Sequence, residues 1–180
     1  MSTENVTFEV ALRSELTELV RAEILSLCNA AYGIDFEPII KSYGGPITHV
    51  LLRVDDELVS HALWIPRWLQ VGSGPLLHTA FVEAVATSPL HRRRGYASLV
   101  MRKIAEEIQD FEIGGLAPSD YQFYEKLGWE LWTGPLLIRK ENERLATPPE
   151  EQAMILRLPK TPKISVSDTL SVEWREGEVW

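Results

Sequence analysis

Hydrophobic and polar positions recur with two periods along the first half of the chain, and these periods predict one helix and several strands. An apolar stripe at helical spacing predicts a helix that Ser14 caps, that runs to about Tyr32 and that Gly33 ends. Between this helix and the next strand we expect an acidic, proline-containing loop. Period-two alternation between turn residues predicts strands over residues 6–12, 49–54, 58–68 and 76–87.

The second half of the chain continues the mixture of helix and strand. Apolar residues at helical spacing predict a helix over residues 94–109. A second helix opens near Pro118 and ends at Gly128. Strands are expected over residues 113–116, 129–132, 136–139 and 153–158, followed by an irregular tail to Trp180.

Composition and charge are those of an ordinary globular domain with a cationic ligand. The chain has 180 residues, of which 45% are hydrophobic and 24% are charged, which predicts a single domain over residues 1–180. The formal net charge of -8 argues against nucleic acid or an anionic membrane as partner. The same charge fits a cationic small molecule.

Cysteine and histidine usage argues against disulfide and metal chemistry. Cys28 has no cysteine partner and lies on an apolar helix face, so we expect a buried core thiol rather than a nucleophile. No apolar run approaches the roughly 18 residues of a membrane span, and the polar start lacks a signal-peptide pattern, so the expected location is cytoplasmic. No metal is expected, because metal-pair spacing is lacking among the histidines His49, His61, His78 and His91.

The candidate chemistry begins at a basic turn over residues 92–97. The turn lies between the apolar strand stretch 81–86 and a predicted helix, so it should present free backbone N–H groups at a helix N-terminus. Arginine side chains and the helix dipole favour an anion there, which predicts a pyrophosphate site that His91 borders. The alternative is a basic helix start on a solvated surface.

The pattern Arg92-x-x-Gly95-x-Ala97 resembles the signature of the GNAT superfamily, the acetyl-coenzyme A dependent N-acetyltransferases. The order of predicted elements also resembles that α/β fold, a mixed twisted sheet with helices on both faces. The resemblance implies acetyl-CoA as cosubstrate. It places these cofactor-binding residues along the site: Val85, Ala86, Arg92, Arg93, Arg94, Gly95, Tyr96, Ala97 and Ser119.

Three further segments resemble the aminoglycoside 2′-N-acetyltransferases: residues 81–86, 123–129 and 173–180. That family's chains end in D-W-R-x-G-D-V-W, and Glu173 and Glu178 stand here in place of the two aspartates. The resemblance implies direct transfer, in a ternary complex, of an acetyl group to the 2′-amine of an aminoglycoside antibiotic, which gives resistance. It also implies a homodimer and an acceptor site completed by the tail 159–180.

Glu83 and Tyr124 are the candidate catalytic residues. Glu83 is a carboxylate in an apolar strand stretch, so it must be paired, hydrated or functional. The resemblance makes it a base that acts through water on the 2′-amine, while an amide N–H near Val85 polarises the acetyl carbonyl and Tyr124 protonates the departing thiolate. The alternatives are a structural carboxylate at a sheet edge and a packing role for the tyrosine.

Acidic loops and the tail supply the candidate acceptor site. Trp174 and Trp180 offer flat surfaces for sugar rings, and the terminal carboxylate of Trp180 offers a fixed anion. Solvated loop carboxylates and a tail that only staples the fold are the alternatives. The predicted substrate-binding residues are Asp35, Glu37, Glu83, Glu151, Glu178 and Trp180, and Glu150 lies beside Glu151 in the same acidic loop.

Three other functions fit part of the same pattern. The changed tail and shortened acidic loop would suit kasugamycin or another small polyamine as acceptor. A noncatalytic acyl-CoA-binding module would keep the basic turn without turnover, and a protein-interaction domain would leave the turn without a ligand. Retention of both Glu83 and Tyr124 favours an enzyme.

Overall fold

The computed structural model describes residues 4–180, which form two compact units. The first unit contains residues 4–65 and 83–104, and the second contains residues 66–82 and 105–180. The helices are α1 (Glu18–Tyr32), α2 (Glu37–Ser42), α3 (Tyr96–Glu107) and α4 (Tyr121–Glu125), with a 3-10 turn at Pro89–His91. The strands are β1 (Val6–Leu12), β2 (Thr48–Val54), β3 (Glu57–Val71), β4 (Leu76–Thr87), β5 (Ile113–Leu116), β6 (Glu130–Leu131), β7 (Leu136–Lys140), β8 (Glu143–Ala146), β9 (Met154–Arg157) and β10 (Leu170–Glu173).

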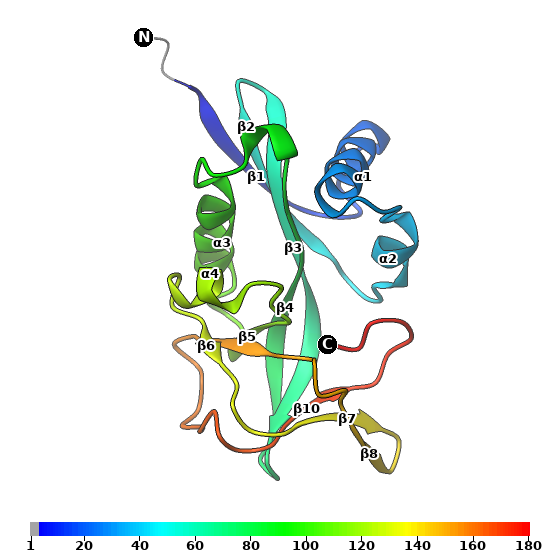
Figure 1. The fold of residues 1–180 in the computed structure, drawn as a ribbon, viewed down its shortest axis with the longest axis vertical. Helices are drawn as coiled ribbons and strands as arrows, with labels where there is room; N and C mark the ends of the chain where they lie inside the picture. The colour runs from blue at the N-terminus through cyan, green and yellow to red at the C-terminus, as the bar shows by residue number, and fades with distance from the viewer. Residues whose placement is uncertain (1–3) are drawn as a thin grey trace. The chain divides into compact units, whose positions relative to one another are not determined.

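In the first unit, β1, β2 and the first half of β3 pair as an antiparallel ladder. Helices lie on both sides of these strands, with α1 and α2 on one side and α3 on the other (Figure 1). The buried face of α1 consists of Ile24, Leu27 and Cys28, as the helical stripe predicts. The thiol of Cys28 is fully buried, which confirms its place in the core.

Two predictions for the start of this unit are wrong in detail. Helix α1 begins three residues later than predicted, because Thr17 and not Ser14 caps it: the Thr17 hydroxyl accepts a hydrogen bond from the Val20 N–H. The predicted loop after Gly33 contains the short helix α2, whose first turn tolerates Pro38 because that position needs no N–H donor. Gly33 ends α1 in the left-handed conformation, as predicted.

The second unit is a mixed sheet with the strand order β6-β9-β5-β4-β3-β10-β7-β8. The pairs β4–β5 and β10–β7 are parallel, and the other pairs for which a register is known are antiparallel. This architecture confirms the predicted α/β class with a mixed sheet. Strand β4 has the bounds that its alternating pattern predicts.

The prediction of an irregular tail is wrong, because the tail contributes β10 between β3 and β7. Its buried residues Leu170 and Val172 fill the sheet, and four residues are too few to show a period. The hairpin strand β8 also lacks a sequence signal, because all four of its residues are exposed. A single domain over residues 1–180 stays a prediction.

Candidate active site

The turn over residues 92–97 has the backbone of an anion-binding loop. Arg93 and Gly95 have φ angles of +64° and +84°, so the backbone has a positive φ at two positions of the turn before α3 begins at Tyr96. The helix start that follows leaves backbone N–H groups without intrahelical acceptors, and such groups are donors for an anion. The two positive φ angles also explain why α3 starts two residues later than predicted.

The arginines of the turn are exposed, and two of them have partners in the first unit. Arg92 donates to the carbonyl of Ala31 at 2.9 Å, and Arg94 lies 3.6 Å from the carboxylate of Glu4. The Tyr96 hydroxyl donates to Glu4 at 2.8 Å, and this hydrogen bond raises the pKa of the phenol. Because the Tyr96 side chain is buried, only its backbone faces a ligand at the turn.

Gly95 supports a prediction about the turn. A Cβ at Gly95 would meet open space, but the φ of +84° is strained for any L residue by about 1–2 kcal/mol. We expect Gly95→Ala to raise the KM for acetyl-CoA about tenfold, since the amides would turn away from the phosphates. Gly72→Ala is the control, because Gly72 also has a positive φ, +55°, and open space around the position of a Cβ, but lies in a hairpin. Steady-state kinetics of this variant should show an unchanged KM, although the protein loses stability.

Strand β4 runs through Ala84, whose φ of +53° distorts the strand between Glu83 and Val85, and we call this distortion the Ala84 bulge. Side chains of the first unit bind the three carbonyls after Glu83. His61 contacts the carbonyl of Ala84 at 3.1 Å, Tyr32 donates to that of Val85 at 2.9 Å, and Ser60 donates to that of Ala86 at 3.1 Å. Each of these three carbonyls is thus in contact with a side chain from another element.

Glu83 is half-buried on this strand, and the Tyr43 hydroxyl donates to its carboxylate at 3.4 Å. Tyr43 is thus one partner that orients the carboxylate. Val85 is also half-buried, whereas Ala86 is buried. In this segment a ligand can contact the backbone around the bulge more readily than the buried Ala86 side chain.

His49 and His61 form a buried pair beneath Ala84. His49 Nδ1 lies 2.9 Å from His61 Nε2, and His61 Nδ1 lies 3.9 Å from the sulfur of Cys28. Burial lowers the pKa of His49 to about 4 and that of His61 to about 3, so both rings are neutral at pH 7. Burial also raises the pKa of Cys28 to about 12, which keeps that thiol protonated and unreactive.

This pair makes the stability of the chain depend on pH. Unfolded histidine takes up a proton near pH 6.5 while the folded pair does not, so the free energy of unfolding should fall as the pH drops from 6.5 toward 4. Each histidine contributes a slope of about 1.4 kcal/mol per pH unit. Urea unfolding at pH 7.0 and 5.5 measures this loss, and the variant His49→Asn with His61→Asn should show a smaller one.

Tyr124 and the tail belong to the second unit. Tyr124 is buried on α4, where its ring packs edge-on against Phe123 and Trp129. Burial, with a smaller contribution from the Asp120 carboxylate, raises its pKa to about 12. The phenol therefore keeps its proton at neutral pH and can act only as a donor of that proton. Ser119, next to this helix, is exposed.

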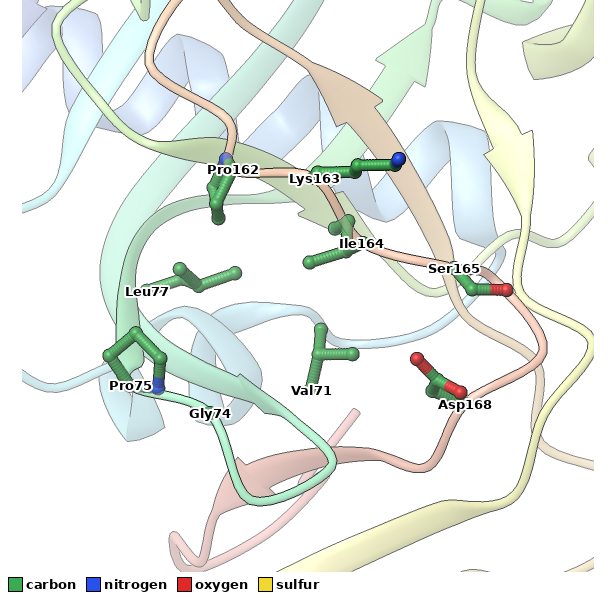
Figure 2. A pocket seen from close by; sticks show the side chains of 9 residues that line it. All are labelled: Val71, Gly74, Pro75, Leu77, Pro162, Lys163, Ile164, Ser165 and Asp168. Atoms are coloured by element: carbon green, nitrogen blue, oxygen red, sulfur yellow. The ribbon is translucent and has the colours of Figure 1, made fainter.

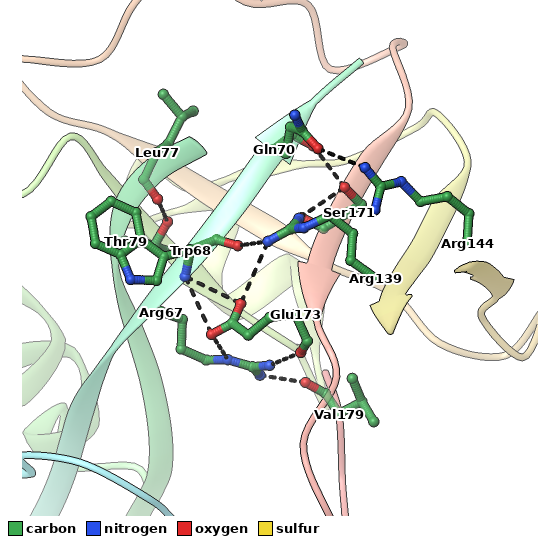
Figure 3. A network of polar contacts seen from close by, with 10 residues as sticks. All are labelled: Arg67, Trp68, Gln70, Leu77, Thr79, Arg139, Arg144, Ser171, Glu173 and Val179. Atoms are coloured by element: carbon green, nitrogen blue, oxygen red, sulfur yellow. Dashed lines mark hydrogen bonds and ion pairs between the residues drawn. The ribbon is translucent and has the colours of Figure 1, made fainter. Parts of the chain in front are cut away.

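A buried arginine anchors the tail. Arg67 donates to the Glu173 carboxylate at 3.2 Å, to the Glu173 carbonyl at 2.6 Å and to the Val179 carbonyl (Figure 3). Its guanidinium also lies 5.2 Å from the centre of the Phe81 ring. Arg67 is not among the predicted site residues, although a charged residue in the apolar strand stretch 58–68 is itself a signal of pairing.

The tail differs from one expectation. The Trp180 side chain is buried and its Nε1 donates to the Thr147 hydroxyl at 2.8 Å, so its ring is not a free surface for a sugar. The ring therefore staples the fold, as the alternative interpretation predicts, and a ligand role for the terminal carboxylate stays a prediction. Trp174 is exposed, with the Lys140 ammonium 4.6 Å from its ring centre.

The buried Arg67 leads to a prediction about stability. We expect Arg67→Met to lower the free energy of unfolding by about 3 kcal/mol, because three acceptors of the tail lose a buried charged donor. Chemical denaturation measures the change. Arg144→Met is the control: Arg144 is exposed with one hydrogen bond to Gln70, and its loss should cost less than about 0.5 kcal/mol.

The predicted acceptor carboxylates are exposed and in part engaged locally. Asp35 accepts from the Glu37 N–H at 3.1 Å, and Glu37 pairs with Lys41 at 2.7 Å. In the second unit, burial first and then the neighbouring charges of Glu150 and Glu178 raise the pKa of Glu151. The effect of Glu178 on Glu151 shows that these two carboxylates lie near each other in the second unit.

Three further features of residues 4–180 concern metal sites, membrane-spanning helices and ligand cavities. Residues 4–180 contain no group of three or more His, Cys, Asp or Glu that could hold a metal ion. Within the same range, no helix is long and apolar enough to span a membrane. A cavity of about 450 Å³ in the second unit, lined by residues such as Leu77, Ile164 and Asp168, contains none of the predicted site residues (Figure 2).

The mixed sheet and the basic turn before α3 agree with the class of N-acetyltransferase that the pattern at residues 92–97 resembles. The protein-family model of the acetyltransferase (GNAT) domain matches residues 15–132 of the sequence. This match covers more than half of the chain, and the chain belongs to the GNAT family of N-acetyltransferases.

Individual proteins with a similar sequence or fold give a more specific comparison than the family model. The aminoglycoside 2′-N-acetyltransferase of Mycolicibacterium fortuitum is 26% identical over 138 residues, which cover 73% of this chain and 70% of the relative. The GNAT family N-acetyltransferase YhbS of Escherichia coli, solved in complex with CoA, superposes with a TM-score of 0.69 at 14% identity over 98% of this chain and 93% of its own. A GCN5-related N-acetyltransferase of Kribbella flavida gives a TM-score of 0.59 at 21% identity; the match covers 72% of this chain but only 34% of that one.

Proposed function

We propose that this chain transfers the acetyl group of acetyl-CoA to the 2′-amine of an aminoglycoside antibiotic and thereby gives resistance. The observation that carries the proposal is the left-handed backbone at Arg93 and Gly95 before α3, which fits the diphosphate of the donor. The similarity to the Mycolicibacterium fortuitum enzyme supports the choice of acceptor. The net charge of -8 supports a cationic acceptor.

The turn suits the cosubstrate in three ways. Its backbone N–H groups are donors for phosphate oxygens, its exposed arginines supply positive charge, and Gly95 lets the phosphates approach the backbone closely. Bound there, acetyl-CoA supplies a thioester whose carbonyl carbon is open to attack by an amine. Ser119 and the half-buried Val85 are the further proposed contacts to it.

Two side chains carry the proton transfers in this proposal. As the nitrogen of the acceptor forms its bond to the acetyl carbon, its proton passes through a water molecule to the Glu83 carboxylate. As the carbon–sulfur bond breaks, the Tyr124 phenol gives its proton to the sulfur. The reaction forms no covalent bond to the protein, which agrees with the protonated, buried thiol of Cys28.

Acceptor binding rests on fixed negative charge. Glu151, Glu178 and the terminal carboxylate of Trp180 are the proposed partners of ammonium groups in the second unit, and Asp35 and Glu37 are those in the first. Glu37 would have to exchange its ion pair with Lys41 for one with the acceptor. A homodimer and a cytoplasmic location stay predictions for this chain.

A thiol-release screen tests the proposal. The full chain is mixed with acetyl-CoA and one antibiotic at a time, namely gentamicin and tobramycin with 2′-amines, matched antibiotics with a 2′-hydroxyl, and kasugamycin. Release of CoA with the 2′-amino compounds and none with the 2′-hydroxyl compounds is expected. Release with kasugamycin alone would move the acceptor to that scaffold, and silence across the panel with intact CoA binding would overturn the proposal.

A further inference from the structure

We propose that His61, supported by His49, is a positioning residue for acetyl transfer: it fixes the peptide between Ala84 and Val85 so that the Val85 N–H faces the thioester carbonyl. The inference rests on the proposed function, since it concerns how that reaction's carbonyl is polarised. All the residues that carry it belong to the first unit.

The direction of the Val85 N–H follows from the bond that His61 makes. The Ala84 carbonyl and the Val85 N–H belong to one trans peptide group, in which they point in opposite directions. His61 holds the carbonyl at 3.1 Å from a fully buried ring. The N–H therefore points away from His61, as a donor to a carbonyl bound on the other side of this peptide must.

The hydrogen bonds also determine the tautomers of both rings. A carbonyl only accepts, so His61 Nδ1 carries the proton and His61 Nε2 is an acceptor. His49 Nδ1 must then donate across the 2.9 Å contact, which leaves His49 Nε2 without a proton. His49 Nε2 is buried without a hydrogen-bond partner among residues 4–180. This agrees with a ring whose single proton lies on Nδ1.

Charged groups around His49 keep the pair neutral. Arg13 and Arg21 disfavour a proton on His49, in addition to burial. The same two arginines line a cavity of about 150 Å³ beside His49, together with the ion-paired side chains Glu37 and Lys41. A protonated His49 would place a further positive charge next to two others, so the neutral donor chain persists throughout the neutral pH range.

The bulge needs such support because alanine rarely adopts a φ of +53°. A strained residue in a strand persists only where its surroundings determine it. Here the Tyr32 hydroxyl holds the next carbonyl at 2.9 Å, and His61 holds the strained residue itself. Loss of the His61 bond would free the peptide to rotate while the rest of the strand stays in place.

Two isosteric variants separate positioning from packing. In His61→Asn the amide nitrogen stands near the place of Nδ1 and can still donate to the Ala84 carbonyl, whereas in His61→Gln it stands near the place of Nε2 and cannot. We expect His61→Gln to lower kcat about 100-fold, as loss of an aligned oxyanion donor does, and His61→Asn to stay within about fivefold of the wild type. The Kd for CoA, measured by calorimetry, should change in neither.

Equal losses of kcat in the two variants, or a loss that falls on CoA binding alone, would overturn the inference. Nitrogen-15 NMR of the histidines in the wild-type chain is a second test that needs no turnover and no folded variant. It should show His61 protonated on Nδ1 and not on Nε2, and the opposite tautomer would also overturn the inference. Wild-type silence in the antibiotic screen with the expected tautomer would count against the proposed function and leave the orientation of the peptide intact.

Discussion

Replacing Tyr124 with phenylalanine should lower kcat by about 10²–10⁴-fold while the KM for acetyl-CoA stays within a few-fold of the wild type. A general acid acts in the transition state, so its loss slows the chemical step more than it weakens binding. The phenol ring of Tyr124 is buried and packs against Phe123 and Trp129, and the phenylalanine ring fills the same space. Only the proton donor is lost.

The pKa of Tyr124 gives the same prediction a pH dependence. Burial raises this pKa to about 12, so the donor proton is present at any pH below that value. The rate should therefore show no descending limb from Tyr124 between pH 7 and 10, and it would fall only as the pH approaches 12. A kcat profile measured with 2′-amino antibiotics checks this range.

The neighbouring Tyr121 offers a matched control for the Tyr124 variant. Tyr121 begins the same helix and is exposed, so Tyr121→Phe should leave kcat within about twofold. If Tyr124→Phe retained more than about a third of the wild-type kcat, another group or water would have to protonate the sulfur. The hydroxyl of Tyr124 would then have no role beyond packing.

The sequence was sufficient to predict the elements whose burial follows a period. Strand β4 alternates between buried and half-buried residues over its last five positions before Thr87, and its bounds match the prediction. Helix α1 buries one stripe and ends at Gly33. In α1 and in these positions of β4 a local pattern predicts the burial, because one face of the element meets the core there.

Elements held by distant partners could not be predicted. Strand β10 is a strand because β3 and β7 supply hydrogen-bond partners on both sides, about 100 and 34 residues away in the sequence. The bulge at Ala84 is equally hidden, since no glycine marks its positive φ. Its conformation depends on His61 and Tyr32, which come from other elements.

The candidate site divides in the same way. The turn at Gly95 has a local motif, and the structure gives this glycine the left-handed backbone for which the motif requires it. The partners that hold the chain near Glu83 have no such motif. In the sequence, His49 and His61 resemble ordinary polar residues in strands. They come close only because the turn between β2 and β3 pairs these strands, with His49 opposite Leu63 and His61 opposite Leu51.

Replacing Glu83 with glutamine should lower kcat by about 100-fold or more, because the amide cannot accept the proton that leaves the acceptor amine. The side chains have the same shape, and the Tyr43 hydroxyl that donates to Glu83 at 3.4 Å can donate equally to the glutamine carbonyl oxygen. The fold and the bulge should therefore be kept. Single-turnover measurements isolate the chemical step, and calorimetry with CoA shows whether donor binding is unchanged.

Tyr43→Phe separates the charge of Glu83 from its orientation. This variant removes the Tyr43 hydroxyl that donates to Glu83 and leaves the carboxylate, so we expect kcat to fall by less than about tenfold. A large loss in Glu83→Gln with a small one in Tyr43→Phe assigns the effect to proton acceptance. If Glu83→Gln kept the wild-type rate across pH 6–9, the acceptor amine would lose its proton directly to solvent, and the carboxylate would only help to hold the cationic acceptor.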